Sequence, residues 1–317
     1  MVKMPLVTIV IPVFNGTNYM NQAIDSALNQ TYKNIEILVV NDGSRDNGAS
    51  AAIARSYGEK IKYLEKENGG VSTALMLAIS QMNGEYFSWL SHDDLYEPQH
   101  IESQVEVLNK NKGSDCVISS TKMYMEFTKT LIKDPVRFSI FPKTPAPVSS
   151  FISWYYACSI LVNKKFFEEY YQFATKYRIV QDLPYTFYVL YYANVAFNRS
   201  DFSIRRDHDN TMKQKEIQVI FKREYTELLT DLINTYGFTF FISNQSKKYN
   251  KFYLIFLYHQ FIVNDMGGLK HLFESRISDR MPMLRPFKTA IPFILKLMYA
   301  ATNLTNRIYR RIMIITH

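Results

Sequence analysis

The sequence predicts an α/β fold in which a mostly parallel sheet carries helices on both faces. Short apolar stretches rich in Val, Ile and Leu alternate with amphipathic stretches over the first third of the chain. Uniformly apolar strands are typical of sheets buried on both faces, and alternation with helices favours parallel pairing. With 317 residues, the chain is long enough to bury a sizeable core.

The first two strands are expected at 6–14 and 35–40, because both runs are apolar throughout and rich in β-branched residues. An amphipathic helix from about 19 to 29 joins them, and another helical stretch begins at Asp46. The same pattern then repeats. The later elements expected are a strand at 61–64, a turn at 68–70, a helix at 71–82, a strand at 86–90, a helix at 98–111 and a strand at 116–125.

Two segments after residue 125 have no clear periodicity. The proline-rich stretch 129–148 predicts a loop over the sheet. The stretch 154–159, WYYACS, is interpreted either as a source of exposed aromatic faces for a ligand or as a core strand.

Polar clusters follow each of the first four predicted strands. In open α/β sheets, ligands bind outside the carboxyl ends of the strands. The glycine patterns of dinucleotide-binding and P-loop proteins are absent from the sequence, so neither class is expected. The clusters are Asn15, 41–44, 68–70 and 91–94.

The fourth cluster contains an acidic pair, Asp93 and Asp94. Adjacent carboxylates disfavour each other's ionisation, and a divalent cation between them relieves the repulsion. Oxygen ligands of this kind suit Mn²⁺ or Mg²⁺, which proteins commonly hold together with substrate phosphates. The alternative is that the pair caps the helix that follows Pro98.

Charge and cysteine content limit the classes of binding partner and the cellular compartment. A net charge of +8 suits an anionic partner, but no nucleic acid is expected because the basic residues concentrate in the tail. Two distant cysteines and no signal-peptide pattern predict a cytoplasmic protein.

Residues 280–317 hold seven Lys or Arg and no acidic residue, which predicts contact with the inner face of an anionic membrane. The alternative is a helix packed on the preceding domain or on a second copy in a homo-oligomer.

Four motifs, in this order and spacing, resemble those of the family-2 glycosyltransferases with the Rossmann-like GT-A fold. They are 11–16 (IPVFNG), 39–44 (VVNDGS), 68–72 (NGGVS) and 90–94 (LSHDD), and they cover roughly the first 100 residues. The resemblance implies a nucleoside-diphosphate sugar as donor, a divalent metal ion and inversion at the anomeric carbon.

The resemblance also assigns roles at the nucleotide. Pro12 and Phe14 would lie against the nucleoside, and Asp42 would accept a hydrogen bond from the base, which favours UDP- or dTDP-sugars. Asp93 and Asp94 would hold the metal. Each of these residues also has a structural alternative: Pro12 could end a strand, Phe14 could be a core residue, and Asp42 could form a turn. The remaining donor-site residues it implies are Asn15, Asn68, Gly70, Ser91 and His92.

Three positions depart from the commonest family pattern. Ser91 stands where an aspartate is usual, His92 where a small residue is usual, and Leu75 where an arginine often lies. With one negative charge fewer, metal affinity is expected to depend on the bound diphosphate.

Two later motifs extend the resemblance to about two thirds of the chain. In Gln181-Asp182-Leu183, Asp182 matches the general base that takes the acceptor's proton, and an N-cap is the alternative. In 204–210, IRRDHDN, expected to follow a short strand, Arg206 or His208 would reach the diphosphate or metal. A solvated charge cluster is the alternative for that motif.

Two regions are predicted. Residues 1–212 would form a catalytic domain, and residues 213–317 would form a helical, basic, aromatic-rich region that contacts a membrane. Within the domain, 1–112 would bind the nucleotide sugar and 113–212 the acceptor. The predicted function is metal-dependent, inverting transfer of a sugar to a glycan or lipid-linked acceptor in cell-surface polysaccharide synthesis. A sugar-phosphate nucleotidyltransferase and a non-catalytic nucleotide-sugar-binding or scaffold protein are the alternatives.

Overall fold

The structure is a computed structural model that describes residues 4–133, 155–207 and 215–236. The chain divides into two compact units, Met1–Glu224 and Tyr225–His317. The first unit contains the sheet and every site residue discussed below. Residues 280–317, for which membrane or subunit contact is predicted, lie outside the described residues. Within the described ranges, none of the helices combines the length and apolar character needed to cross a membrane.

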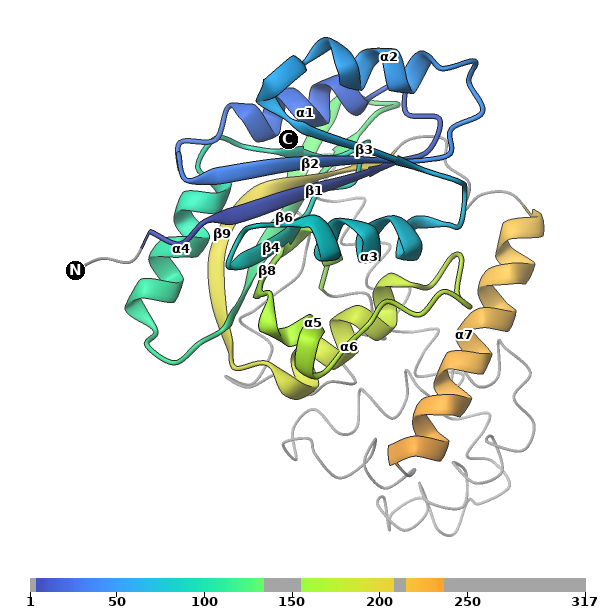
Figure 1. The fold of residues 1–317 in the computed structure, drawn as a ribbon. Coiled ribbons are helices and arrows are strands. Elements are labelled where there is room, and N and C mark those ends of the chain that lie inside the picture. Colours follow the sequence, from blue (N-terminus) through green and yellow to red (C-terminus); the bar gives the residue numbers. More distant parts are fainter. Residues whose placement is uncertain (1–3, 134–154, 208–214, 237–317) are drawn as a thin grey trace, which may run out of the picture. The chain divides into compact units, whose positions relative to one another are not determined.

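A nine-stranded sheet in the order β3-β2-β1-β4-β8-β6-β9-β5, with β7 paired to β6, forms the centre of the first unit (Figure 1). Strands β3, β2, β1 and β4 are parallel, whereas β8 is antiparallel to both of its neighbours. The strands are β1 (Val7–Val13), β2 (Ile35–Asp42), β3 (Lys62–Lys66), β4 (Tyr86–Trp89), β5 (Leu95–Tyr96), β6 (Cys116–Met125), β7 (Thr130–Lys133), β8 (Ile160–Asn163) and β9 (Val195–Asp207).

Helices cover both faces of the sheet, with α1 and α2 above β1–β3 and α3 below them in Figure 1. Alternate residues of β1 enter two separate cores: Ile9 and Ile11 pack with α1 and α4, and Val10 packs with α3 and α6. The helices are α1 (Met20–Leu28), α2 (Ala49–Ser56), α3 (Val71–Gln81), α4 (His100–Lys110), α5 (Lys165–Glu169), α6 (Asp182–Tyr192) and α7 (Lys215–Tyr236), with short 3-10 turns at Gly58–Lys60 and Ala157–Ser159.

The predicted strands and helices of the first 125 residues are confirmed, with shifts of a few residues at their ends. Three predictions after residue 125 are wrong in part. The start of the expected loop at 129–148 is strand β7, because it pairs with β6; 134–148 lies outside the described residues. The core strand that was one of two alternatives for 154–159 is instead a 3-10 turn at Ala157–Ser159, and the short strand expected before Ile204 is the 13-residue β9.

Candidate active site

The first candidate residues lie at the carboxyl end of β1. Pro12 is buried within the strand, whereas the Phe14 side chain beyond it is 41% exposed, so Phe14 is not a core residue. The Asn15 side-chain oxygen accepts the Arg45 amide at 2.7 Å, and the Asn15 amide donates to the Ser44 hydroxyl at 2.9 Å. These bonds join the ends of β1 and β2. An exposed aromatic ring beside this fixed turn is suited to stack on a base.

Asp42, at the end of β2, is buried and holds the turn that follows β3. Its carboxylate accepts the amides of Gly69 at 3.0 Å and Gly70 at 2.8 Å, and Lys66 Nζ lies 2.7 Å away. The Asn68 side-chain amide donates to the main-chain oxygen of Asp42 at 2.8 Å. Asp42 therefore has a turn-holding role, at a different turn from the one considered in the sequence. A carboxylate has about four acceptor positions, and the Asn68 side-chain amide, 3.4 Å from the second oxygen, takes the last of them, so a base N–H would have to replace one of these donors.

The acidic pair after β4 consists of two residues in different environments. Asp93 is half-buried, whereas Asp94 is 2% exposed. The Tyr156 hydroxyl and the Arg206 amide, the latter at 2.9 Å, donate to the two carboxylate oxygens of Asp94. Burial and the charge of Asp93 raise the pKa of Asp94 to about 7. The pair is therefore a place where a nearby cation would favour the ionised state.

Ser91 and His92 precede the acidic pair and pack against neighbouring elements. The Ser91 hydroxyl lies 3.3 Å from the Cys158 sulfur. The His92 ring contacts Gly16 closely, since a Cβ at Gly16 would lie 3.2 Å from the ring. Both residues are half-buried beyond the end of β4, and their donor-site role stays a prediction.

Arg206 is 9% exposed and its guanidinium is held by groups from three parts of the chain. It donates to the main-chain oxygen of Asp93 at 2.9 Å, to Glu126 at 2.7 Å and to the Gln22 side chain at 2.8 Å. These bonds oppose the alternative of a solvated charge cluster. Through these bonds the guanidinium stabilises the loop that carries the acidic pair. The other candidate of that motif, His208, lies outside the described residues.

Arg205, which was not singled out in the sequence, lies on β9 directly before Arg206. Its guanidinium carbon is 5.5 Å from the centre of the Tyr156 ring, and its charge lowers the pKa of both Asp94 and Asp182 against the effect of burial. The alternation of side chains along a strand could have identified Arg205 from the sequence. Because neighbouring residues of a strand point to opposite faces, Arg205 cannot share the surroundings of Arg206. The charge of Arg205 acts on both carboxylates.

Asp182 is the first residue of α6 and is half-buried. Burial raises the pKa of its carboxyl to about 6, while the amides of Asp182 and Leu183 act in the opposite direction. The N-cap is Gln181, whose side chain makes no capping hydrogen bond, so the N-cap alternative for Asp182 is wrong. A carboxylate with a raised pKa in a partly exposed position has the properties of a general base.

A metal site of three or more protein ligands is absent among the described residues. The chemistry of Asp93 and Asp94 nevertheless fits a hard cation, because two adjacent carboxylates offer oxygen ligands and repel each other. The remaining ligands would have to come from a substrate. The metal role of this pair, like the donor roles above, stays a prediction.

The comparisons with known proteins agree with this geometry. Residues 8–171, more than half of the chain, match the model of glycosyl transferase family 2. The chain therefore belongs to this family.

Several relatives are longer than this chain. A Rickettsia felis protein named "uncharacterized glycosyltransferase" is 42% identical over 67% of the chain and 36% of its own length. A Rickettsia conorii protein of the same description is 36% identical over 90% of the chain and 44% of its own length. Pasteurella multocida chondroitin synthase is 37% identical over 38% of the chain and 12% of its own length. The chain thus spans less than half the length of these relatives.

Solved structures confirm the fold. S. aureus TarS has a TM-score of 0.58 at 15% identity, over 80% of this chain and 43% of its own. A complex of its residues 1–349 with UDP-GlcNAc gives a TM-score of 0.54 at 14% identity, over 83% and 74% of the two chains. The mannosyltransferase PcManGT of Pyrobaculum calidifontis, in complex with GDP-Man and Mn²⁺, gives 0.55 at 14% identity, over 98% and 83%. The predicted GT-A class of α/β fold is therefore correct.

Proposed function

We propose that this protein transfers a sugar from a nucleoside diphosphate to an acceptor hydroxyl, with inversion at the anomeric carbon. The observation that carries the proposal is the charge of Arg205, which acts on both Asp94 and Asp182. We infer from this shared charge that the acidic pair and a carboxylate suited to proton transfer belong to one site. Membership of glycosyl transferase family 2 supports the same reaction class.

The nucleotide would bind across the carboxyl ends of β1 and β2. Phe14 is exposed enough to stack on the base, and the buried Asp42 carboxylate would accept a base N–H in place of one of its present donors, as uracil and thymine both offer. We therefore propose a UDP- or dTDP-sugar as donor. TarS in complex with UDP-GlcNAc is consistent with this choice, whereas PcManGT binds GDP-Man.

The diphosphate would lie beside Asp93 and Asp94. A Mn²⁺ or Mg²⁺ ion held there would neutralise phosphate charge and stabilise the departing diphosphate. Since the oxygens of Asp94 already accept the Tyr156 hydroxyl and the Arg206 amide, Asp93 is the better placed of the two to contact the ion directly.

Asp182 would take the proton of the attacking hydroxyl. An alcohol must lose its proton as it attacks the anomeric carbon, and a positioned carboxylate contributes about 10²- to 10⁴-fold to such a step. One displacement from the face opposite the diphosphate inverts the configuration. The acceptor we propose is a glycan or lipid-linked glycan in polysaccharide synthesis, supported by the partial similarity to chondroitin synthase.

A thermal-shift panel tests the donor site. UDP, dTDP and GDP would each be measured with Mn²⁺ and with a chelator. A nucleotide at about 100 times its Kd stabilises the folded protein by about 2.7 kcal/mol. We expect UDP or dTDP to raise the melting temperature more with Mn²⁺, and Asp93→Ala to lose that metal-dependent part. Equal shifts with metal and with chelator would remove the metal from the proposal.

A further inference from the structure

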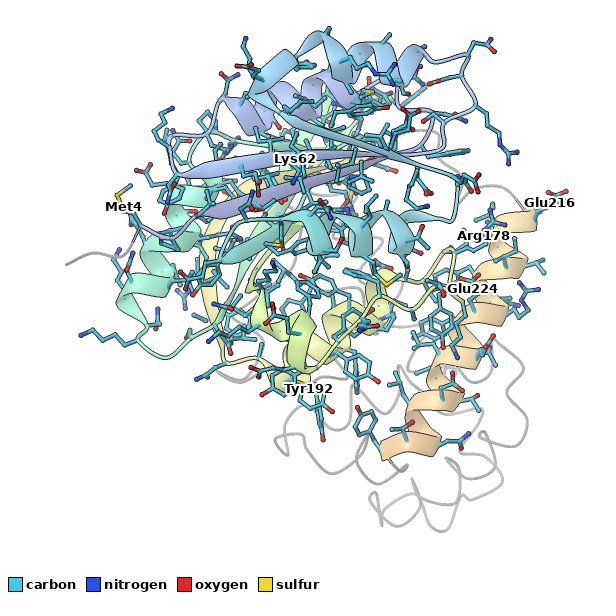
Figure 2. The ribbon with its side chains drawn as sticks, viewed as in Figure 1. Met4, Lys62, Arg178, Tyr192, Glu216 and Glu224 are labelled. Atoms are coloured by element: carbon cyan, nitrogen blue, oxygen red, sulfur yellow. The ribbon has the colours of Figure 1, made fainter. Side chains whose placement is uncertain are left out.

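Glu224 lies on α7, near the C-terminal limit of the first unit, and is 3% exposed. Its carboxylate accepts the amides of Arg178 at 3.0 Å, Ile179 at 2.8 Å and Val180 at 3.3 Å. Figure 2 shows Glu224 on α7 beside Arg178 on the loop. One side chain therefore holds three successive amides of the segment that leads into α6.

The energetics of this contact favour a single geometry. A buried carboxylate loses its hydration, and several well-directed N–H groups are needed to compensate for that loss. Three successive amides that converge on one anion form such a concave site. The segment cannot shift without leaving the carboxylate or the amides unpaired, and an unpaired buried polar group is unfavourable.

The held segment ends two residues before the candidate base. The Leu183 amide donates to the Val180 oxygen at 3.0 Å, so the chain passes directly from the held amides into the first turn of α6, where Asp182 lies. On its other side, the Ala174 oxygen accepts the Ser72 hydroxyl at 3.1 Å. The loop is thus attached to α3 from the donor half and to α7 through Glu224.

We propose that Glu224 is a positioning residue, which sets the place of Asp182 by fixing the backbone of residues 178–180. The inference rests on the proposed function, since it concerns the base of that reaction. It also places the start of α7 with the catalytic unit, beyond the predicted boundary at 212, in agreement with the division of the chain after Glu224. The sequence contains a signal for this role. Glu224 is an acidic residue on an apolar stretch of helix, with Phe221, Tyr225 and Leu228 at neighbouring positions.

The test uses four full-length variants: Glu224→Gln, Glu224→Ala, Asp182→Asn and the control Glu216→Gln. Glu216 is an exposed acidic residue about two turns earlier on α7. The measurements are amide hydrogen exchange, binding of UDP, dTDP and GDP with Mn²⁺, and release of nucleoside diphosphate from the matching sugar nucleotides across a pH series.

In Glu224→Ala we expect faster exchange at residues 178–180 and turnover reduced by about 10-fold or more, because small displacements of a reacting group carry large rate penalties. Nucleotide affinity should stay within about twofold of wild type, since no donor-site residue is altered. The acidic limb of the pH profile should move to lower pH as Asp182 gains solvent. Glu224→Gln, which retains one acceptor oxygen, should fall between Glu224→Ala and wild type, and Glu216→Gln should match wild type.

Each other outcome has a separate meaning. Unchanged exchange at 178–180 in Glu224→Ala, or unchanged turnover and acidic limb despite faster exchange, would overturn the positioning role. Loss of nucleotide affinity in proportion to turnover would also overturn it, by showing a general structural effect. If Glu224→Ala does not fold, Glu224→Gln decides the question by the same criteria. Full turnover by Asp182→Asn would instead refute the base in the proposed function.

Discussion

The Asp94 carboxylate accepts the main-chain amide of Arg206 at 2.9 Å, although 112 residues separate the two in the chain. This bond ties the loop after β4 to the end of β9, and the Tyr156 hydroxyl donates to the other oxygen of the same carboxylate. Asp94 therefore organises three chain segments around the candidate metal site. Its neighbour Asp93 is more exposed.

Asp94→Ala should lower the free energy of unfolding by about 2–4 kcal/mol, because two buried donors lose their acceptor. Asp94→Asn should lose less, since its side-chain oxygen can still accept the Arg206 amide. Urea denaturation measures both values. Asp93→Asn is the matched control and should change stability by less than about 1 kcal/mol at its half-buried position. Equal losses at the two positions would contradict this division of roles.

The sequence predicted where the site lies better than it predicted what each side chain does. Strand ends could be located from local apolar runs, so the grouping of Asn15, Asp42 and the acidic pair followed from topology. The partners of Arg206 could not be located in this way. They lie 80 to 184 residues away in the chain, and no local pattern encodes such contacts.

The same limit applies to two of the three errors after residue 125. Strand β7 lies at the start of a proline-rich stretch, and its pairing with β6 outweighs the local turn signals. Strand β9 is long because it pairs with both β6 and β5, which is a property of the sheet and not of its own residues. In both cases, pairing with strands distant in the sequence determined the extent of the strand.

A second prediction concerns Gly43, which has a φ of +64° and no room for a side chain. A Cβ there would lie 2.5 Å from the main-chain nitrogen of Asn68, in the turn that Asp42 holds. Gly48, with a φ of +81° and nothing within 4 Å, is a matched control for backbone strain alone. We expect Gly48→Ala to lose about 1–2 kcal/mol of stability and Gly43→Ala about 2–4 kcal/mol.

The same Gly43→Ala variant should also bind UDP with Mn²⁺ more weakly, because the displaced turn carries Asn68 and Gly70. Calorimetric titration and urea denaturation of both variants give the two comparisons. Similar losses of stability in Gly43→Ala and Gly48→Ala would show that the close approach to Asn68 has no energetic weight.

A third prediction is that His100 makes the fold sensitive to acid. Its ring is fully buried, 4.1 Å from the Tyr96 ring, and within the described residues neither ring nitrogen has a hydrogen-bond partner. Desolvation lowers the pKa of His100 to about 3. The unfolded chain, with a pKa near 6.5, then binds the proton that the folded chain rejects, so this residue reduces stability as pH falls below about 6.5.

His100→Phe removes that titration. Between about pH 7.5 and about pH 5, the stability of wild type should fall by about 2 kcal/mol more than that of the variant. Any packing change caused by Phe is independent of pH and cancels in this difference. Parallel pH dependence of the two proteins in urea denaturation would show that the ring is hydrated or paired when protonated.

The last prediction concerns Asp182, whose proposed task is to take the acceptor's proton. Asp182→Asn keeps the size of the side chain but cannot accept the proton, so transfer should fall by about 10²-fold or more while nucleotide affinity stays close to wild type. In wild type, turnover should decline as pH falls through about 6, because the raised pKa of Asp182 leaves the base protonated there. The product should have the anomeric configuration opposite to that of the donor.

Stability should change in the opposite direction to activity in this variant. The folded pKa of Asp182 lies above its unfolded value, so ionisation is less favourable in the folded state and stability falls as pH rises from about 4 through about 6. Asp182→Asn avoids this penalty and should be as stable as wild type or more stable at neutral pH. A variant that is both less stable and weaker in nucleotide binding would have lost structure. Near-normal transfer by Asp182→Asn would remove this residue as the base and leave the proposed reaction to depend on the acidic pair alone.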